Sequence, residues 1–190
     1  MLLLETMDAA DLSAEDDLEA RFEAFVASHR ERALRLAWRL VGGDHAAAED
    51  VTQDALVRAH GALARFRGEA RLETWFYRIL VRQASSHRRW RRVRERFGRV
   101  DPESAVHPRP AAAGDPFLRQ RIGRALETLS AGQRQAFVMV HLEGMSVSET
   151  AEILGRTAGT IKSHLHRALA KLRQELGDLR DGREEEDHDR

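Results

Sequence analysis

All four prolines of the chain fall between Pro102 and Pro116, within the segment VDPESAVHPRPAAAGDP. Proline prevents a helix from continuing and restricts the residue before it. This segment also lacks any apolar periodicity, so we predict a linker over about residues 97–116. The linker divides the 190 residues into two stretches, each long enough for a small domain.

The first stretch has apolar residues at the three- and four-residue steps that are typical of helices. We predict a helix over 19–41 that ends at a Gly-Gly pair, a second helix capped by Asp44 and running through Phe66, and a third from about Leu72 into an arginine-rich run. The predicted core positions are Phe22, Phe25, Val26, Leu34, Trp38, Val51, Ala55, Ala59, Leu63, Phe66, Trp75, Ile79 and Leu80.

The second stretch is also helical in pattern. Ile122, Leu126 and Leu129 mark one helix, and two later sequences, SAGQ and SVSE, resemble capping boxes. Glycines stand where helices should stop, and a final helix is predicted from about Ala158 to Leu176. No run alternates as a strand does. The predicted fold is therefore all-α, with two small helical domains joined by a flexible linker.

The formal net charge of +0 hides a strong segregation of charge. The first twenty residues contain seven acids and no Lys or Arg, whereas the stretch from Arg78 to Arg99 contains nine Arg and one Glu. The segment after Leu176 is acidic again. We therefore expect solvated acidic tails at 1–18 and 177–190 and a basic central surface suited to a polyanion.

Cysteine is absent, which excludes disulfides and cysteine metal sites. No apolar stretch approaches the ~20 residues that a bilayer span needs. We expect a cytoplasmic protein that is not inserted in a membrane and that carries no metal and no cofactor.

The strongest local motif is SVSETAEILGRTAGTIKSHLHRALAKLRQEL. It predicts a short capped helix, a tight turn at 155–157 and a longer helix, the pattern of a DNA-binding helix-turn-helix. No acid occurs from Arg156 to Gln174. One face of the longer helix is apolar, and a plain helical hairpin would use it equally well. The other face carries the candidate DNA-binding residues Thr160, Lys162, Ser163, His166 and Arg167.

Two further surfaces are candidates for binding. The run TWFYRILVRQASSHRRWRR places aromatic residues directly before arginines, which suits melting or single-stranded nucleic acid, although Trp75 and Ile79 could equally be core residues. The preceding helix carries Asp50, Gln53 and Asp54 away from its apolar stripe. An acidic patch suits a basic protein surface, and acids are also favoured at any helix N-terminus.

With both halves considered, the chain resembles an extracytoplasmic-function (ECF) RNA polymerase sigma factor of the sigma-70 family. EDVTQDALVRAHGALARFRG and TWFYRI resemble region two, and LSAGQRQAFVMVHLEGMSVSETAEILGRTAGTIKSHLHRALAKLR resembles region four. The resemblance covers about residues 20–96 and 116–176. It implies region two over 19–96 and region four over 117–176.

The resemblance implies a non-enzymatic factor that binds core RNA polymerase and directs promoter-specific initiation. Region two would bind the clamp helices of the largest subunit through Asp50, Gln53 and Asp54. It would also capture the minus-ten element and the melted strand, and region four would bind the polymerase flap and recognise the minus-thirty-five element. An anti-sigma factor is a further possible partner. The implied minus-ten and melted-strand residues are Trp75, Tyr77, Arg78, Arg82, Arg88, Arg89, Arg91 and Arg92.

Two positions depart from the family pattern. Arg82 stands where relatives commonly place Asn, and His164 where they often place Arg. Promoter bases therefore do not transfer from a relative. Two other classes stay open from the sequence alone: a helix-turn-helix regulator that acts without docking on polymerase, and a nuclease, which would need a clustered ligand set that the chain does not show.

Overall fold

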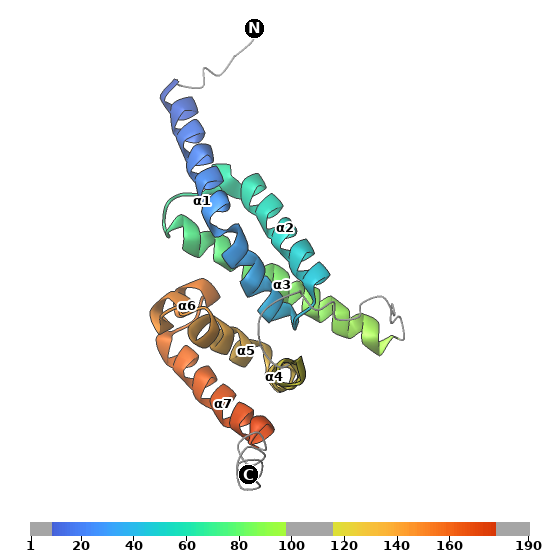
Figure 1. The fold of residues 1–190 in the computed structure, drawn as a ribbon. Helices are drawn as coiled ribbons and strands as arrows, with labels where there is room; N and C mark the ends of the chain where they lie inside the picture. The colour runs from blue at the N-terminus through green and yellow to red at the C-terminus, as the bar shows by residue number, and fades with distance from the viewer. Residues whose placement is uncertain (1–8, 98–115, 178–190) are drawn as a thin grey trace, which may run out of the picture.

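The computed structural model describes residues 9–97 and 116–177, and every regular element in those ranges is a helix. The first domain contains α1 (Ala9–Val41), α2 (His45–Ala62), the 3-10 helix η1 (Leu63–Arg65) and α3 (Leu72–Arg96). The helices α1, α2 and α3 form a three-helix bundle in which each helix packs against the other two, shown in blue to green in Figure 1. The predicted linker lies almost wholly outside the described residues.

The second domain contains five elements: α4 (Pro116–Thr128), α5 (Ala131–Phe137), the π-helix η2 (Val138–Leu142), α6 (Val147–Leu154) and α7 (Ala158–Leu176). In it α7 runs along α5 and α6 and reaches α4 near its own C-terminal end (Figure 1). The all-α prediction with two helical domains is confirmed.

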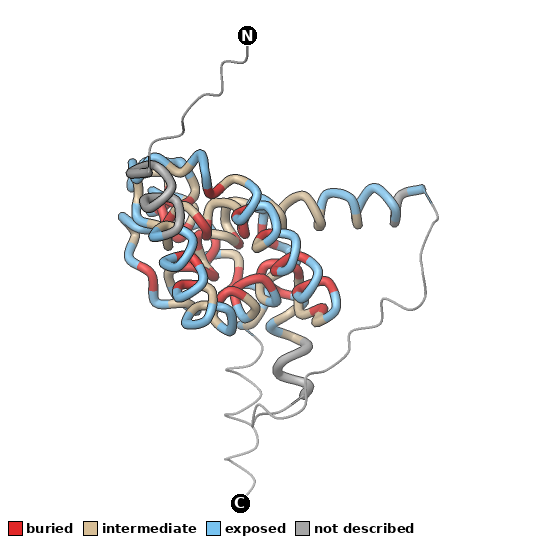
Figure 2. Tube along the Cα trace, turned by 90° about the horizontal axis from the view of Figure 1, so that it is seen from above, coloured by how far each residue is buried: buried red, intermediate tan, exposed pale blue. Residues whose placement is uncertain are grey.

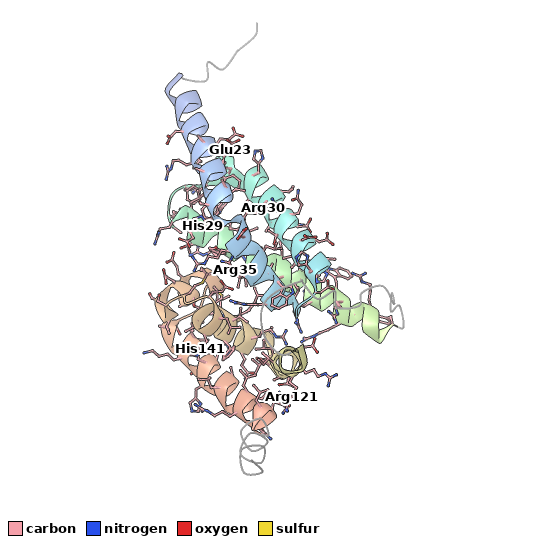
Figure 3. All side chains as sticks on the ribbon, in the orientation of Figure 1. Glu23, His29, Arg30, Arg35, Arg121 and His141 are labelled. Atoms are coloured by element: carbon pink, nitrogen blue, oxygen red, sulfur yellow. The ribbon has the colours of Figure 1, made fainter. Side chains whose placement is uncertain are left out.

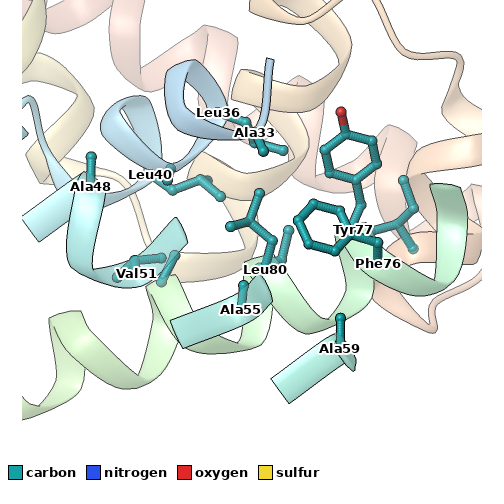
Figure 4. Close-up of a cluster of buried hydrophobic side chains, with 14 of the residues drawn as sticks. Ala33, Leu36, Leu40, Ala48, Val51, Ala55, Ala59, Phe76, Tyr77 and Leu80 are labelled. Carbon is teal, nitrogen blue, oxygen red and sulfur yellow. The ribbon is translucent and has the colours of Figure 1, made fainter. Parts of the chain in front are cut away.

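Small residues let α1, α2 and α3 approach closely. Ala33, Ala48, Ala55 and Ala59 are fully buried in this core, and Figure 4 shows them along the packed faces of the helices with Leu80 and Phe76. The burial of these residues and of the larger Phe76 removes apolar surface from water, which is the main stabilising contribution in a bundle of this size. The predicted stripe on α2 from Val51 to Leu63 is confirmed as core.

The turn between α1 and α2 is built as the sequence predicts. Gly42 and Gly43 have φ values of 95° and 88°, a region that side chains other than glycine rarely adopt. Asp44 then caps α2, because its carboxylate accepts a hydrogen bond from the backbone N–H of Ala47 at 3.0 Å. This turn fixes the direction in which the acidic face of α2 points.

A buried arginine ties α4 to α5. The guanidinium of Arg134 donates hydrogen bonds to the carbonyl oxygens of Leu126, Glu127 and Leu129, at 2.8, 3.0 and 3.2 Å. These carbonyls lie at the end of α4, where most backbone carbonyls lack a partner within the helix, and that of Leu126 also accepts a hydrogen bond from the backbone N–H of Leu129 at 3.3 Å. Burial lowers the pKa of Arg134 to about 10, so the group stays charged near neutral pH.

Four local predictions from the sequence need correction. Trp38, a predicted core position on α1, is exposed. α1 begins at Ala9 rather than near residue 19, and its acidic first turns are where acids favour a helix. α2 ends at Ala62, with η1 following it before Phe66. On α3 the fully buried residues are Phe76, Tyr77 and Leu80, whereas Trp75 and Ile79 lie at the margin of the core.

The last part of α3 extends away from the rest of the molecule. Figure 2 shows this end as a projecting helix with mostly exposed residues. Trp90 and Phe97 are exposed to 58% and 80% there, and arginines lie between them. Within the described residues, no helix is long and apolar enough to cross a membrane.

Candidate nucleic-acid interface

The helix-turn-helix forms as the sequence predicts. Ser146 and Glu149 make a complete capping box at the start of α6, and Gly155 ends that helix in the left-handed conformation at φ 61°. Thr157 then caps α7 by accepting a hydrogen bond from the backbone N–H of Thr160. Three residues therefore separate the two helices, and each helix end is satisfied locally.

The two faces of α7 differ as predicted. Ile161, Leu165 and Leu172 are buried against the rest of the domain. On the other side, the predicted residues Lys162, Ser163, His166 and Arg167 are all exposed, and Thr160 is half-buried. A convex helix with one exposed basic and hydroxyl-bearing face has the shape and the donors needed to enter a major groove.

The opposite flank of α7 is pressed onto α5. A Cβ added to Gly132 would lie 2.9 Å from Nε2 of His164, so the glycine permits a close approach of the two helices there. His164 therefore points toward α5 and not into the exposed face. The predicted DNA-binding face of α7 does not include it.

The predicted polymerase-binding residues form one exposed patch. Asp50, Gln53 and Asp54 are all exposed on α2. Figure 1 shows that α2 lies on the side of the first domain away from the second domain, so the patch is open in this arrangement. Charged side chains also cover the other outer surfaces of both domains (Figure 3).

The predicted residues on α3 fall into two groups. Arg82, Arg89 and Arg92 are exposed. The others are half-buried or buried. Trp75 packs on Phe66 with ring centroids 5.1 Å apart, and the guanidinium of Arg88 donates a hydrogen bond to the carbonyl of Leu40. Arg78 and Arg91 are half-buried, and Tyr77 is fully buried. The described part of the chain contains no cluster of His, Cys, Asp and Glu able to hold a metal ion.

Comparison with known proteins identifies both domains. Residues 25–94 match the family model described as Sigma-70 region 2, and residues 119–172 match Sigma-70, region 4. The chain is 36% identical over 155 residues to "RNA polymerase sigma-E factor" of Streptomyces avermitilis, a match that covers 82% of this chain and 84% of that protein. The chain is an ECF sigma factor of the sigma-70 family.

Other relatives agree with this assignment. "ECF RNA polymerase sigma factor SigM" of Mycobacterium tuberculosis is 33% identical over 161 residues, covering 85% of this sigma factor and 80% of the relative. Among solved structures, the sigma factor RpoE in complex with the anti-sigma factor NepR from Bartonella quintana has a TM-score of 0.66. That structure is 31% identical and covers 83% of this chain and 97% of its own. The structure of CnrH in complex with the cytosolic domain of CnrY has a TM-score of 0.65 at 26% identity, and the match covers 88% of this chain and 95% of that one.

Regions 2 and 4 of this sigma factor pack directly on each other. Val138, Met139, Met145 and Ile153 of region 4 belong to the same buried cluster as the core of region 2. Arg39 of α1 donates hydrogen bonds to the carbonyl of Leu142 and to the carboxylate of Glu143. The interface is therefore both apolar and polar.

Docking covers part of the predicted minus-ten surface. The guanidinium of Arg78 donates to the carbonyl of Glu152 at 3.1 Å and lies 3.5 Å from its carboxylate. Tyr77 is fully buried, with the guanidinium of Arg32 5.7 Å from its ring centroid. In this arrangement Tyr77 is covered and Arg78 is half-buried in its contact with region 4, and their roles at the minus-ten element stay predictions.

No sequence pattern predicted the residues that join the two regions. Arg32 and Arg39 lie on α1, whereas Glu143 and Glu152 lie more than 100 residues later in region 4 and follow no shared motif, so only the tertiary structure brings them together. The burial of Phe76, by contrast, could have been predicted from the spacing of apolar residues in the sequence. Phe76, Leu80 and Ala84 recur at four-residue steps, which marks the buried face of α3.

Proposed function

We propose that this cytoplasmic sigma factor binds core RNA polymerase through region 2 and recognises the two elements of a promoter, one with each region. The exposed acidic patch of Asp50, Gln53 and Asp54 docks on the clamp helices of the largest subunit. The chain has no catalytic role of its own. The observation that carries the proposal is that this patch and the basic face of α7 are both exposed, on different domains of one chain.

Charge supports the assignment of each surface. Asp50 and Asp54 lie one helical turn apart and together present two carboxylates to a basic partner. Lys162 and Arg167 provide cations for phosphates and guanine edges in the minus-thirty-five element. The arginines of α3 bind phosphates of the minus-ten region, and its aromatic residues stack on the melted strand once region 4 moves off them.

Polymerase docking is tested by charge reversal on α2. We expect Asp50→Arg with Asp54→Arg to weaken binding to core polymerase by about tenfold or more, because two attractive contacts become repulsive. Both side chains are exposed, so the fold should be unaffected. The measurement is the equilibrium affinity of the purified chain for core polymerase in the absence of DNA.

A matched control is available on the same domain. Glu23 on α1 (labelled in Figure 3) and Glu69 before α3 are also exposed. Glu23→Arg with Glu69→Arg changes the net charge by the same amount and should leave the affinity for core polymerase unchanged. If both double variants lose affinity equally, only net charge matters. If neither does, the patch is not the docking site, and a helix-turn-helix regulator that acts without polymerase becomes the better account.

A further inference from the structure

Two adjoining cavities, of about 860 and 740 Å³, lie along the junction of regions 2 and 4. Ser85, Arg89, Ala131 and Gln135 line both of them, so they form one continuous groove between α3 and α5. Gln135 Nε2 donates a hydrogen bond to Ser85 Oγ at 2.8 Å across it. We call the residues that line the two cavities the arginine groove.

The groove carries a concentrated positive charge. Among the described residues that line either cavity there is no Asp or Glu. Nearby acids in the described part of the chain include Glu152, which pairs with Arg78, and Glu127, which lies beside Arg88 near Gly42. They are fewer than the cations, and like charges this close favour the binding of an anion. The basic residues of the lining are Arg78, Arg82, Arg88, Arg89, Arg92, Arg134, Arg156 and His164.

Burial and the positive charge of the groove both lower the pKa of Arg134, which lines the groove. After burial itself, Arg88 and Arg92 are the next causes that lower the pKa of Arg134. Arg82, Arg89, Arg92 and Arg156 are exposed, so their guanidinium groups can be reached by a ligand from solvent. The groove thus suits an extended anionic segment better than a single small ion.

The chain itself contains such a segment. The run Glu184–Asp187 has four consecutive acids, and it follows α7 by only a few residues. Lys171 Nζ near the end of α7 donates to the carbonyl of Thr128 at 2.6 Å, three residues before Ala131 in the groove. The end of α7 is therefore on the order of 20–30 Å from the groove, and an extended chain spans roughly 23–36 Å between Gly177 and this run.

The acidic N-terminal segment does not satisfy the same geometry. Leu40, near the end of α1, lines the groove, whereas the helix begins at Ala9. That separation is about 46 Å along the helix axis. An extended segment of the preceding eight residues reaches only about 28 Å, so its acids fall short of the groove.

We propose that the acidic run Glu184–Asp187 binds in the arginine groove and competes there with the phosphates of DNA. The competition rests on the proposed function, since the groove contains arginines assigned to the minus-ten region. The docking itself does not. With the run in place, the closed arrangement of regions 2 and 4 gains an extra ionic link, and DNA must displace it.

Docking is tested without DNA by a paramagnetic label. The chain has no cysteine, so His188→Cys provides one attachment point for a spin label beside the acidic run. We expect the amide NMR signals of Ser85, Arg89 and Gly132 to lose more than half of their intensity at low salt and to regain it at high salt, because the contacts are ionic. The same label at Thr6→Cys should leave these signals unchanged.

Competition is tested with two variants that each remove four negative charges. The C-terminal variant combines Glu184→Gln, Glu185→Gln, Glu186→Gln and Asp187→Asn. The N-terminal control combines Asp8→Asn, Asp11→Asn, Glu15→Gln and Asp16→Asn. We expect the C-terminal variant to bind duplex DNA about tenfold more tightly at low salt, the combined effect of four weak exposed ion pairs, and the control to bind as the unmodified chain does.

The outcomes separate the two proposals. Unchanged NMR signals with the label at residue 188 would overturn the docking of the acidic run, and any DNA binding by the groove would then belong to the promoter interface alone. Signals that weaken equally with both labels would show non-specific attraction and would also overturn it. A third outcome is strong loss of signal with the label at residue 188 alone, together with no DNA binding by the unmodified chain or by either charge-removal variant. This outcome would support docking of the acidic run and contradict the proposed promoter contacts.

Discussion

Tyr77 is the single tyrosine of the chain, and its side chain is fully buried on α3 beside region 4. Among the described residues its hydroxyl has no hydrogen-bond partner. Burial raises the pKa of Tyr77 to about 12, and the nearby Arg32 opposes that rise. A hydroxyl buried without a partner has a free-energy cost, and exposure of this side chain to water would remove that cost.

We predict that the absorbance of tyrosinate in the folded chain titrates with a midpoint near 12. Denaturant should return it to about 10, the value of an exposed tyrosine. Because the folded pKa is above the unfolded one, the stabilisation is fully present below pH ~10 and is lost as the pH rises through ~12. The free energy of unfolding should therefore fall over that window, and Tyr77→Phe should remove the fall. A midpoint near 10 in the folded chain would contradict the buried position.

Arg134 is the other residue whose role the structure defines closely. We predict that Arg134→Met lowers the free energy of unfolding by about 2–3 kcal/mol, because three hydrogen bonds from the buried guanidinium to carbonyl oxygens at the end of α4 are lost. Chemical denaturation followed by circular dichroism measures this. Arg124→Met, at an exposed position on α4, is the control. Equal stability of Arg134→Met and the unmodified chain would show that the fork contributes nothing net.

At the scale of elements, local sequence signals predicted most helix ends. Both capping boxes, the Asp44 cap and the stops at Gly42-Gly43 and Gly155 depend on residues close together in the chain, so the sequence contains the information. The π-helix η2 was not predicted. The wider turn of a π-helix does not change the spacing of apolar residues enough to be recognised in the sequence. In the structure, Val138 and Met139 of η2 are buried in the same cluster as the core of region 2.

For the candidate site, the sequence predicted the exposed face of α7 and the acidic patch of α2, since an amphipathic helix separates its faces by a fixed period. It did not predict which residues of α3 are covered. Coverage of Tyr77 and Arg78 depends on region 4, whose position is set by contacts such as Arg78 with Glu152. Contacts between distant helices have no local pattern.

The recognition helix α7 allows a prediction that separates two kinds of DNA contact. Lys162 and Arg167 are both exposed on it. We expect Arg167→Ala to cost about 1–3 kcal/mol and to relax the preference at one base pair of the upstream element, and Lys162→Ala to weaken all sequences about equally. The measurement is the binding of holoenzyme to a set of single-base variants of that element. A uniform loss with Arg167→Ala would mean that this residue positions the helix and does not recognise a base.

At the scale of the whole molecule, one ion pair at the junction is well shielded. The side chain of Glu143 is only 4% exposed and that of Arg39 28%. Breaking a shielded pair by removing one partner leaves the other charge without compensation, which costs more than losing a surface pair. The docked arrangement of regions 2 and 4 should therefore depend on it, alongside the apolar contacts of Met139 and Met145.

We predict that Arg39→Glu weakens docking by about 2 kcal/mol, because two carboxylates then face each other. The mean size of the chain in solution scattering should increase, and the midpoint of the Tyr77 titration should move toward 10. The exchanged pair, Arg39→Glu with Glu143→Arg, should recover part of both properties. Failure of the exchanged pair to recover either one would show that the contact is not an ionic link between regions.

The account as a whole holds that one chain connects core polymerase to a promoter with two elements. Transcription by core polymerase from a library of randomised upstream sequences tests this most directly. With the unmodified chain, the sequenced transcripts should arise from templates that share two short elements at a constant spacing. Core polymerase alone, or with Asp50→Arg and Asp54→Arg in the chain, should lack this enrichment. The same start sites with and without the chain would contradict the account.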